Sequence, residues 1–353
     1  MSAMPNRVFI DPTNVDPLII EKAAHLISSG KLVAFPTETV YGIGANAFDR
    51  VAVEKIFTVK RRPGTDPIIV HIHALSQLDD VARDVPDLAL SLARRFWPNP
   101  LTMILRRASN IPDNVSSGLP TVAVRMPNHP IALALLAAAK VPIAAPSANL
   151  FTRPSATTGR HVLEDFGSAV DLILDGGAAT IGIESTVIDL TVEIPVVLRP
   201  GGLPMEPLRE IIPTIRIESN YLTGQHPASS PGMLLKHYSP HATVLLFSGE
   251  DEARVLEGMR AKAWELKSLG NRVGILVTAH QGVHFSDKTF TKFALGEGPD
   301  TDSIAKSLYN GMRALDAEAV DFILVSAPKR QGLGLALWDR LYRAAEGKVL
   351  SVD

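Results

Sequence analysis

Short, continuous apolar runs that stop abruptly at polar residues recur along the first 205 residues of the chain. In the first of them, residues 32–35, four apolar residues stop at Pro36, and a stretch of small hydroxyl residues around Glu38 leads to the pair Gly42 and Gly44. Runs without polar alternation are typical of strands buried on both faces. We therefore expect a covered sheet whose strands deliver polar segments to a ligand, with both glycines in the first of these segments as close-packing positions.

The order of apolar and amphipathic segments predicts an α/β (α+β) protein with two domains. Strands are expected at 32–35, 67–72, 101–105, 121–125, 142–145, 172–174, 186–190 and 195–198, with helices at 16–29, 50–59, 88–97 and 129–140. A second group follows, with strands at 242–247, 272–278, 288–294 and 322–326 and helices at 251–269, 302–315 and 333–345. The predicted organisation is a first domain at 12–210, a linker at 211–241 that is rich in Pro, Gly, Ser and His, and a small α/β domain at 242–353.

Composition excludes several classes of protein. The 353-residue chain has a net charge of −2 and no cysteine, so the whole chain does not attract nucleic acid by its charge, and disulfides, thiolate zinc sites and a cysteine nucleophile are excluded. No signal-peptide pattern is present at the start, and the longest run of small apolar residues, 131–139, is too short to span a bilayer. These features predict a soluble cytoplasmic protein.

The glycine pair at Gly42 and Gly44 fits G-x-G-x-x-A, which alone is a weak dinucleotide signal. Six residues separate the preceding strand from the first glycine, whereas a Rossmann turn follows its strand at once. The pair Gly332 and Gly334 is a weaker signal still. The chain has no P-loop, no H-E-x-x-H and no G-x-S-x-G motif.

Several charged residues have both a structural and a functional interpretation. The cluster 60–62 (KRR) either complements the C-terminus of a helix or clamps a polyphosphate, because Arg and Lys both match phosphate oxygens. His71, at the end of an apolar strand, is more often a structural residue than a ligand-binding one. Arg125 follows four mostly apolar residues and needs a carboxylate partner, from protein or from ligand.

Hydroxyl and arginine residues follow further strands, with little acid among them. They are found in the segments 146–149 (PSAN), 153–155 (RPS), 184–186 (EST) and 199–202 (RPGG). Each segment is equally consistent with a simple turn. Together they are what a pocket for an anionic, hydrogen-bonding ligand needs, such as a nucleoside triphosphate with a small carboxylate.

In this order, the motifs resemble the YrdC-type domain. They read FPTETVYGIGANA, KRRP, PIIVHI, TVAVRMP, APSAN, RPSAT, DGG, ESTVIDL and LRPGG. The trailing linker, with SPGMLLKHYSP, and the second domain resemble the long form of the threonylcarbamoyl-AMP synthase family. The resemblance implies a twisted, open mixed sheet with a concave basic ligand face, followed by a small Rossmann-like domain.

The resemblance also implies a reaction. L-Threonine, bicarbonate or CO2, and ATP with Mg2+ would give L-threonylcarbamoyl-AMP, pyrophosphate and water, so the chain would be a nucleotidyltransferase. Separate proteins would transfer the threonylcarbamoyl group to tRNA adenosine. No membrane partner is expected, and the sequence leaves open whether the chain itself contacts tRNA weakly.

Site residues follow from the resemblance position by position. Those expected at L-threonine are Thr37, Thr39, His71, Arg125, Ala145 and Ser185, with Arg125 pairing with the substrate carboxylate. Those expected at ATP are Lys60, Arg62, Asp66, Thr121, Ser147, Asn149, Ser155, Arg199 and Tyr238. Lys60 and Arg62 would also be catalytic, by stabilising the leaving pyrophosphate. Asp66 stands where the family often has Asn, and Arg61 is an added charge expected to face solvent.

Three further interpretations remain. Residues 229–238 of the linker would act as a lid over the reactive intermediate. A double-stranded RNA or tRNA-binding module without catalysis is the rival from another class, although net charge and the lack of interleaved aromatics disfavour it. A carbamoyl-adenylate transfer of the hydrogenase-maturation type is a second possible enzymatic function, which the absence of cysteine disfavours.

Overall fold

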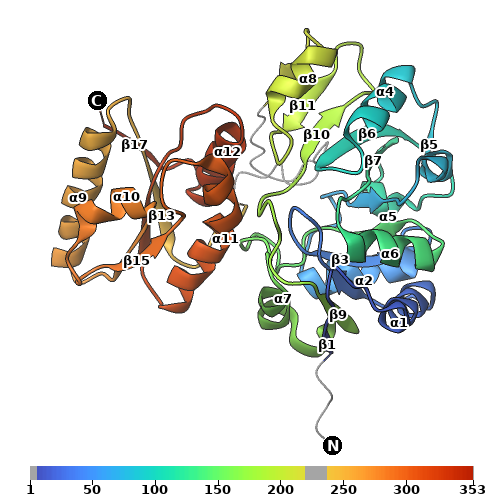
Figure 1. The fold of residues 1–353 in the computed structure, drawn as a ribbon, viewed down its shortest axis with the longest axis horizontal. Coiled ribbons are helices and arrows are strands. Elements are labelled where there is room, and N and C mark those ends of the chain that lie inside the picture. Colours follow the sequence, from blue (N-terminus) through green and yellow to red (C-terminus); the bar gives the residue numbers. More distant parts are fainter. Residues whose placement is uncertain (1–5, 219–236, 353) are drawn as a thin grey trace, which may run out of the picture. The chain divides into compact units, whose positions relative to one another are not determined.

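The computed structural model describes residues 6–218 and 237–352, which form two compact units (Figure 1). The first unit contains the described residues up to Phe151, together with Ser155–Thr180 and 184–218. The second contains Thr152–Pro154, Ile181–Ile183 and 237–352. Most of the expected linker, including residues 229–236 of the expected lid, lies outside the described residues.

A mixed sheet is the framework of the first unit. The described part of this unit contributes twelve strands, which in sheet order are β1 (Arg7–Phe9), β9 (Leu172–Asp175), β2 (Val33–Phe35), β3 (Gly42–Asn46), β8 (Ile143–Ala144), β4 (Ile69–His71), β7 (Thr121–Arg125), β6 (Leu101–Arg107), β10 (Thr186–Asp189), β11 (Val196–Arg199) and β12 (Arg216–Ile217), with β5 (Ala82–Arg83) beside β6. The sheet contains parallel pairs, such as β4 and β7, and antiparallel pairs, such as β6 and β7. The predicted mixed α/β architecture is confirmed.

Helices pack on this sheet. They are α1 (Pro17–Ser28), α2 (Arg50–Lys60), η1 (Leu75–Gln77), α3 (Leu78–Val81), α4 (Asp87–Phe96), α5 (Asp113–Ser116), α6 (Pro130–Ala139), α7 (Gly159–Phe166), η2 (Gly167–Ala169) and α8 (Met205–Ile211). Helix α1 begins where the Asp16 side chain accepts a hydrogen bond from the Leu18 amide. Its apolar stripe, which includes Ile20 and Ile27, packs with α6 against β2 in one buried core. This core supports the strand from which the first polar segment emerges.

The predicted loop at Gly42 and Gly44 is wrong, because this segment is strand β3, antiparallel to β2. The expectation of close packing is confirmed for Gly44. A Cβ at this position would lie 2.6 Å from Cγ2 of Ile143 and 2.8 Å from the Phe35 ring. The absence of a side chain at Gly44 therefore allows the strands to pack closely. The polar segment between β2 and β3 is confined to residues 36–41.

The second unit is a Rossmann-like α/β domain with a parallel sheet. In sheet order its described strands are β15 (Thr291–Ala294), β14 (Val273–Val277), β16 (Phe322–Ser326), β13 (Thr243–Ser248) and β17 (Val349–Ser351), and its helices are α9 (Glu252–Ser268), α10 (Ala279–Gly282), η3 (Val283–Phe285), α11 (Thr301–Ala317) and α12 (Gly334–Ala344). Strand β17 was not predicted.

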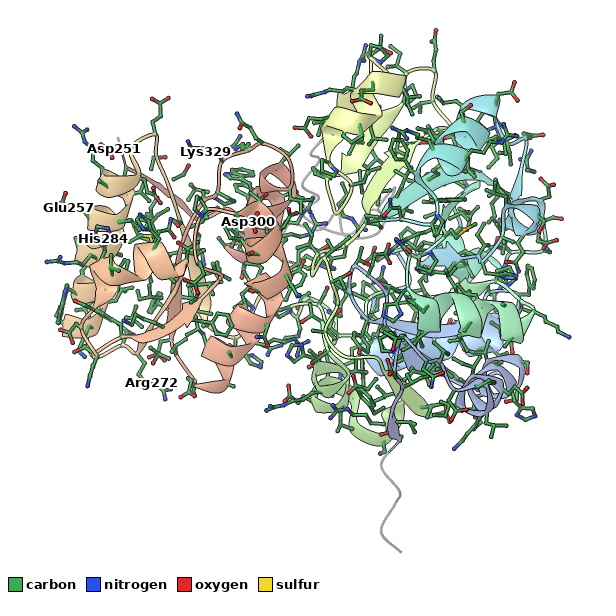
Figure 2. All side chains as sticks on the ribbon, viewed as in Figure 1. Asp251, Glu257, Arg272, His284, Asp300 and Lys329 are labelled. Carbon is green, nitrogen blue, oxygen red and sulfur yellow. The ribbon has the colours of Figure 1, made fainter. Side chains whose placement is uncertain are left out.

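Two aspartates set the starts of the long helices of this unit. Asp251 accepts hydrogen bonds from the first amides of α9, and Asp300 does the same at α11; both side chains are labelled in Figure 2. Such N-caps stabilise a helix by about 1 kcal/mol each. Across 6–218 and 237–352, no helix has the length and apolar character that crossing a membrane requires.

Candidate ligand site

Strand register places three polar side chains on one face of the first sheet. His71, the last residue of β4, is directly opposite Arg125, the last residue of β7. On the other side of β7, Arg125 is opposite Thr102 of β6. Residues directly opposite on neighbouring strands point to the same face. The site is therefore built across the face of the sheet, with all three side chains buried.

Arg125 is the centre of the strongest polar cluster. Its Nη1 donates to Oγ1 of Thr39 at 2.8 Å, and its Nη2 lies 2.5 Å from Oε1 of Glu38. Both side chains of the ion pair are almost fully buried, with exposed fractions of 4% for Arg125 and 6% for Glu38. The protein itself thus supplies a carboxylate partner for Arg125, the side chain of Glu38.

The segment 36–41 is held in a fixed conformation. Oγ1 of Thr37 accepts from the amides of Thr39 and Val40 at 3.2 Å, and it lies 2.8 Å from Oγ1 of Thr39. At the end of the segment, the Tyr41 hydroxyl lies 2.6 Å from the Gly177 carbonyl oxygen and 3.0 Å from Oδ1 of Asp175. Burial and this carboxylate raise the pKa of Tyr41 well above its ordinary value, so the hydroxyl stays protonated. Glu38 is consequently presented by a rigid backbone.

His71 is a neutral residue of the site. Burial, with a smaller effect of the Arg125 charge, lowers its pKa to about 3. Its ring packs edge-on against Phe35, and its Nδ1 forms no hydrogen bond within the described residues. A neutral imidazole beside a guanidinium can orient a ligand without adding a second positive charge.

Ser185 continues the cluster beyond β6. Its Oγ lies 2.7 Å from Oγ1 of Thr102, the residue opposite Arg125. Its carbonyl oxygen accepts from Nη2 of Arg199 at 2.9 Å. The hydroxyl of Ser155 donates to Oε1 of Glu184, the residue before Ser185, at 2.5 Å. Arg199 and Ser155, expected at the nucleotide, are thus connected to the same segment as Ser185.

Lys60 belongs to a second group of candidate residues, those expected to bind ATP. This last residue of α2 is buried, and its Nζ donates to the carbonyl oxygens of Ser147, at 2.6 Å, and Asn149. Ser147 in turn forms an isolated β-bridge with Gly42. The structure therefore brings Lys60, Ser147 and Asn149 together, as predicted candidates for nucleotide binding.

Arg62 and Asp66 form a second buried ion pair. Nη2 of Arg62 lies 3.0 Å from Oδ2 of Asp66 and donates to the Pro67 carbonyl oxygen at 2.7 Å. The acid that departs from the family pattern thus has a guanidinium beside it, which offsets its repulsion of phosphate. Arg61 is exposed, as predicted, and its φ of 53° gives α2 a left-handed C-cap.

Register separates the candidates into two groups along the strands. Thr121 lies four residues before Arg125 on β7, and Ser147 lies four residues beyond Ile143, which is opposite His71. Both residues therefore lie four positions along their segments from the row of His71 and Arg125, and Ala145 is buried between Ile143 and Ser147.

Two candidates are not brought into contact with the others by the described interactions. Thr121 is half-buried at the start of β7, opposite Arg106. Tyr238 belongs to the second unit, where its ring stacks on Tyr309 at 5.5 Å and lies under the Arg340 guanidinium. Its expected place over a nucleotide stays a prediction.

Sequence reasoning underestimated the acids of the site. Glu38, Glu184 and Asp66 are all buried and contact Arg125, Ser155 and Arg62, respectively. Glu38 was visible as the one charge between two threonines, but nothing in the sequence identified its partner. Within 6–218 and 237–352, no group of three or more His, Asp or Glu residues could hold a metal ion.

The second unit has a cavity of its own, of about 630 Å³. It is lined by Ser248, Gly249, Glu250, Lys329, Arg330, Gln331 and Ser351, and Lys329 is labelled in Figure 2. None of the candidate site residues lies in it.

Two family profiles match the chain. The one described as "Telomere recombination", of the Sua5/YciO/YrdC domain, matches residues 25–201. The one described as "Threonylcarbamoyl-AMP synthase, C-terminal domain" matches residues 203–346.

Close relatives cover nearly the whole chain. The threonylcarbamoyl-AMP synthase of Pyrococcus abyssi is 44% identical, covering 94% of this chain and 96% of that protein. The protein of the same name from Bacillus subtilis is 41% identical, covering 98% and 99%. The crystal structure of P. abyssi Sua5 complexed with L-threonine superposes with a TM-score of 0.93 at 42% identity, over 98% of this chain and 99% of that chain.

Proposed function

The chain belongs to the threonylcarbamoyl-AMP synthase family in its two-domain form, and on that premise we propose that it makes L-threonylcarbamoyl-AMP. L-Threonine, bicarbonate (or CO2 derived from it) and ATP are the substrates, and pyrophosphate and water are the other products. The reaction is a nucleotidyl transfer to a carbamate oxygen.

The observation that supports this proposal most directly is the presence of two buried polar groups, one around Arg125 and one around Lys60. In the first group, Arg125 with Thr37 and Thr39 offers a guanidinium and two hydroxyls, which match the carboxylate and side-chain hydroxyl of threonine. In the second group, Lys60 holds its charge beside Ser147, which suits a phosphate group.

Catalysis in this arrangement is mainly positional. The threonine amine, in its neutral form, attacks the carbon of CO2 and loses a proton to give a carbamate; when bicarbonate is attacked, water leaves as well. A carbamate oxygen then attacks the α-phosphorus as pyrophosphate leaves. Negative charge grows on the leaving group, where the fixed charges of Lys60 and Arg62 stabilise it. His71 stays neutral throughout, so its contribution is to orient the amino acid.

We propose that Mg2+ arrives bound to ATP. Mg2+ commonly takes its ligands from phosphate oxygens and water, with one or two carboxylates. The absence of a metal-ligand cluster among the described residues is compatible with this, and Asp66 is the acid nearest the Lys60 and Arg62 cluster in sequence. As a substrate-borne ion, Mg2+ would neutralise phosphate charge.

The product would be consumed by separate proteins that transfer the threonylcarbamoyl group to tRNA. Pyrophosphate release by the purified chain tests the proposal: it should require L-threonine, bicarbonate and ATP together. Release that continues without L-threonine would refute it. Salt-sensitive tRNA binding without pyrophosphate release would instead favour the RNA-binding alternative.

A further inference from the structure

Glu38 occupies an unusual environment for a carboxylate. It lies in the segment between β2 and β3, its side chain is 6% exposed, and its backbone carbonyl oxygen accepts from the Thr180 hydroxyl at 3.4 Å. The bonds of Thr37 on either side fix its direction toward Arg125. A buried charge in a rigid segment is costly unless it is paired or used.

The pairing of Glu38 is incomplete. Its Oε1 is engaged by Nη2 of Arg125 at 2.5 Å, whereas Oε2 accepts no hydrogen bond from any described residue. Ionised carboxylates have about four acceptor positions. The nearby His129 supplies no cation, because burial lowers its pKa against the opposing effect of Glu38. The Glu38 carboxylate can therefore still accept a hydrogen bond from a positively charged donor.

Arg125 has donor capacity left as well. Its Nη1 donates to Thr39 and its Nη2 lies in the ion pair with Glu38, whereas Nε donates no hydrogen bond to the described residues. A guanidinium edge with open donors matches a carboxylate in two-point geometry. The two side chains thus present one positive and one negative group, side by side, each able to accept a ligand.

A zwitterion has the charge pattern that this pair complements. We propose that Glu38 is the residue that binds the α-ammonium group of the amino-acid substrate while Arg125 binds its carboxylate; this rests on the proposed function. On binding, two ligand contacts of the same sign pattern would replace the ion pair of Glu38 and Arg125. Because the ligand is neutral overall, its entry adds no net charge to the buried site.

The role predicts selection of substrates by charge. An α-amino acid gains a charge-assisted hydrogen bond at Glu38, and the corresponding α-hydroxy acid does not. The rival interpretation is that Glu38 only holds Arg125 in place. If Glu38 only held Arg125 in place, its loss would weaken binding of the amino acid and of the hydroxy acid equally. The ratio of the two affinities therefore distinguishes the interpretations.

Calorimetric titration of the full chain tests the proposal with L-threonine and (2S,3R)-2,3-dihydroxybutanoate, in which a hydroxyl replaces the ammonium. Wild type should prefer L-threonine by about 10-fold or more, the size expected for a hydrogen bond between charged groups. Glu38→Gln should reduce that preference to within about 3-fold. Asp339→Asn, the same chemical change at a buried carboxylate of the second unit, should keep the wild-type ratio.

An unchanged ratio in a folded Glu38→Gln variant would overturn the proposal, and so would equal binding of both ligands by wild type. If Glu38→Gln does not fold, Glu38→Asp retains the charge, and loss of the preference for L-threonine in that variant would contradict the role. The pyrophosphate assay distinguishes a failure of the proposed function from a failure of the role proposed for Glu38. Wild type that binds no L-threonine and releases no pyrophosphate refutes the proposed function, whereas an active enzyme with an unchanged ratio refutes the role of Glu38 alone.

Discussion

Nη2 of Arg125 lies 2.5 Å from Oε1 of Glu38, and both side chains are buried. The two residues come from different elements, the segment after β2 and the end of β7. Their pairing puts a charge of each sign at the centre of the proposed amino-acid site. The stability of this pair and its use in binding can be measured separately.

Removing one partner should destabilise the fold more than removing both charges. Arg125→Met leaves a buried, unpaired Glu38 and should lower the free energy of unfolding by about 3–5 kcal/mol. Adding Glu38→Gln should recover part of this loss, because no buried charge is then left. Chemical denaturation of the two variants and wild type measures the difference. Arg160→Met, which breaks the exposed pair with Glu164, should cost at most about 0.5 kcal/mol; a double variant less stable than Arg125→Met would contradict the account.

Lys60 should be needed for nucleotidyl transfer but not for amino-acid binding. Lys60→Met should reduce the rate of pyrophosphate release by about 10²–10³-fold, the effect of removing one positioned donor. The dissociation constant of L-threonine should stay within about 3-fold of the wild-type value. Arg61→Met provides the matched control, because this neighbouring cation is exposed, and its rate should be near that of wild type. Equal losses of rate in the two variants would contradict this, because they would show that the overall positive charge of the segment matters and not the position of the Lys60 ammonium group.

Gly44 should not tolerate a methyl group. The Cβ of Gly44→Ala would contact Phe35 and Ile143 at distances below 3.0 Å, and overpacking of this kind costs about 1–3 kcal/mol. Gly64→Ala is the control, since nothing lies within 4 Å of its Cβ position. Thermal unfolding should show a lower midpoint for the first variant only, and an unaffected Gly44→Ala would contradict the described packing of β3.

The glycine pair also shows where prediction from sequence stops. Apolar runs predicted β2, β4, β7 and β10 because burial of both faces leaves a local signature. Strand β3 has no such signature. Its place depends on close packing of Gly44 against Phe35 of β2 and Ile143 of β8. A pattern of glycines could not distinguish this from a turn.

The site was predictable in its residue types but not in its pairings. Lys60, Ser147 and Asn149 were expected near one ligand, and the structure brings them together. The partner of Arg125 was expected to be a carboxylate from protein or ligand, and the packing of the segment after β2 against the end of β7 decides that Glu38 supplies it. This contact joins residues far apart in the chain, so the local sequence does not encode it.

His71 should make the fold sensitive to acid. Its folded-state pKa of about 3 lies below the ordinary value of about 6.5 expected in the unfolded chain. Between these values the unfolded state binds a proton that the native state does not, so stability falls as the pH drops from about 6.5 toward 3. The slope contributed by this one group approaches 1.4 kcal/mol per pH unit, roughly one proton. His71→Gln should remove that contribution; denaturation curves at pH 4.5 and 7 that show the same pH dependence in both proteins would contradict the buried neutral imidazole.

The mass of the adenylated product tests the central claim most directly. Purified chain with ATP, Mg2+, L-threonine and 13C-labelled bicarbonate should form a product with the mass of threonylcarbamoyl-AMP, shifted by one mass unit relative to unlabelled bicarbonate. The shift shows that the carbon of bicarbonate lies between the amino acid and the nucleotide. A product with the mass of threonyl-AMP, or one that carries no label, would contradict the account.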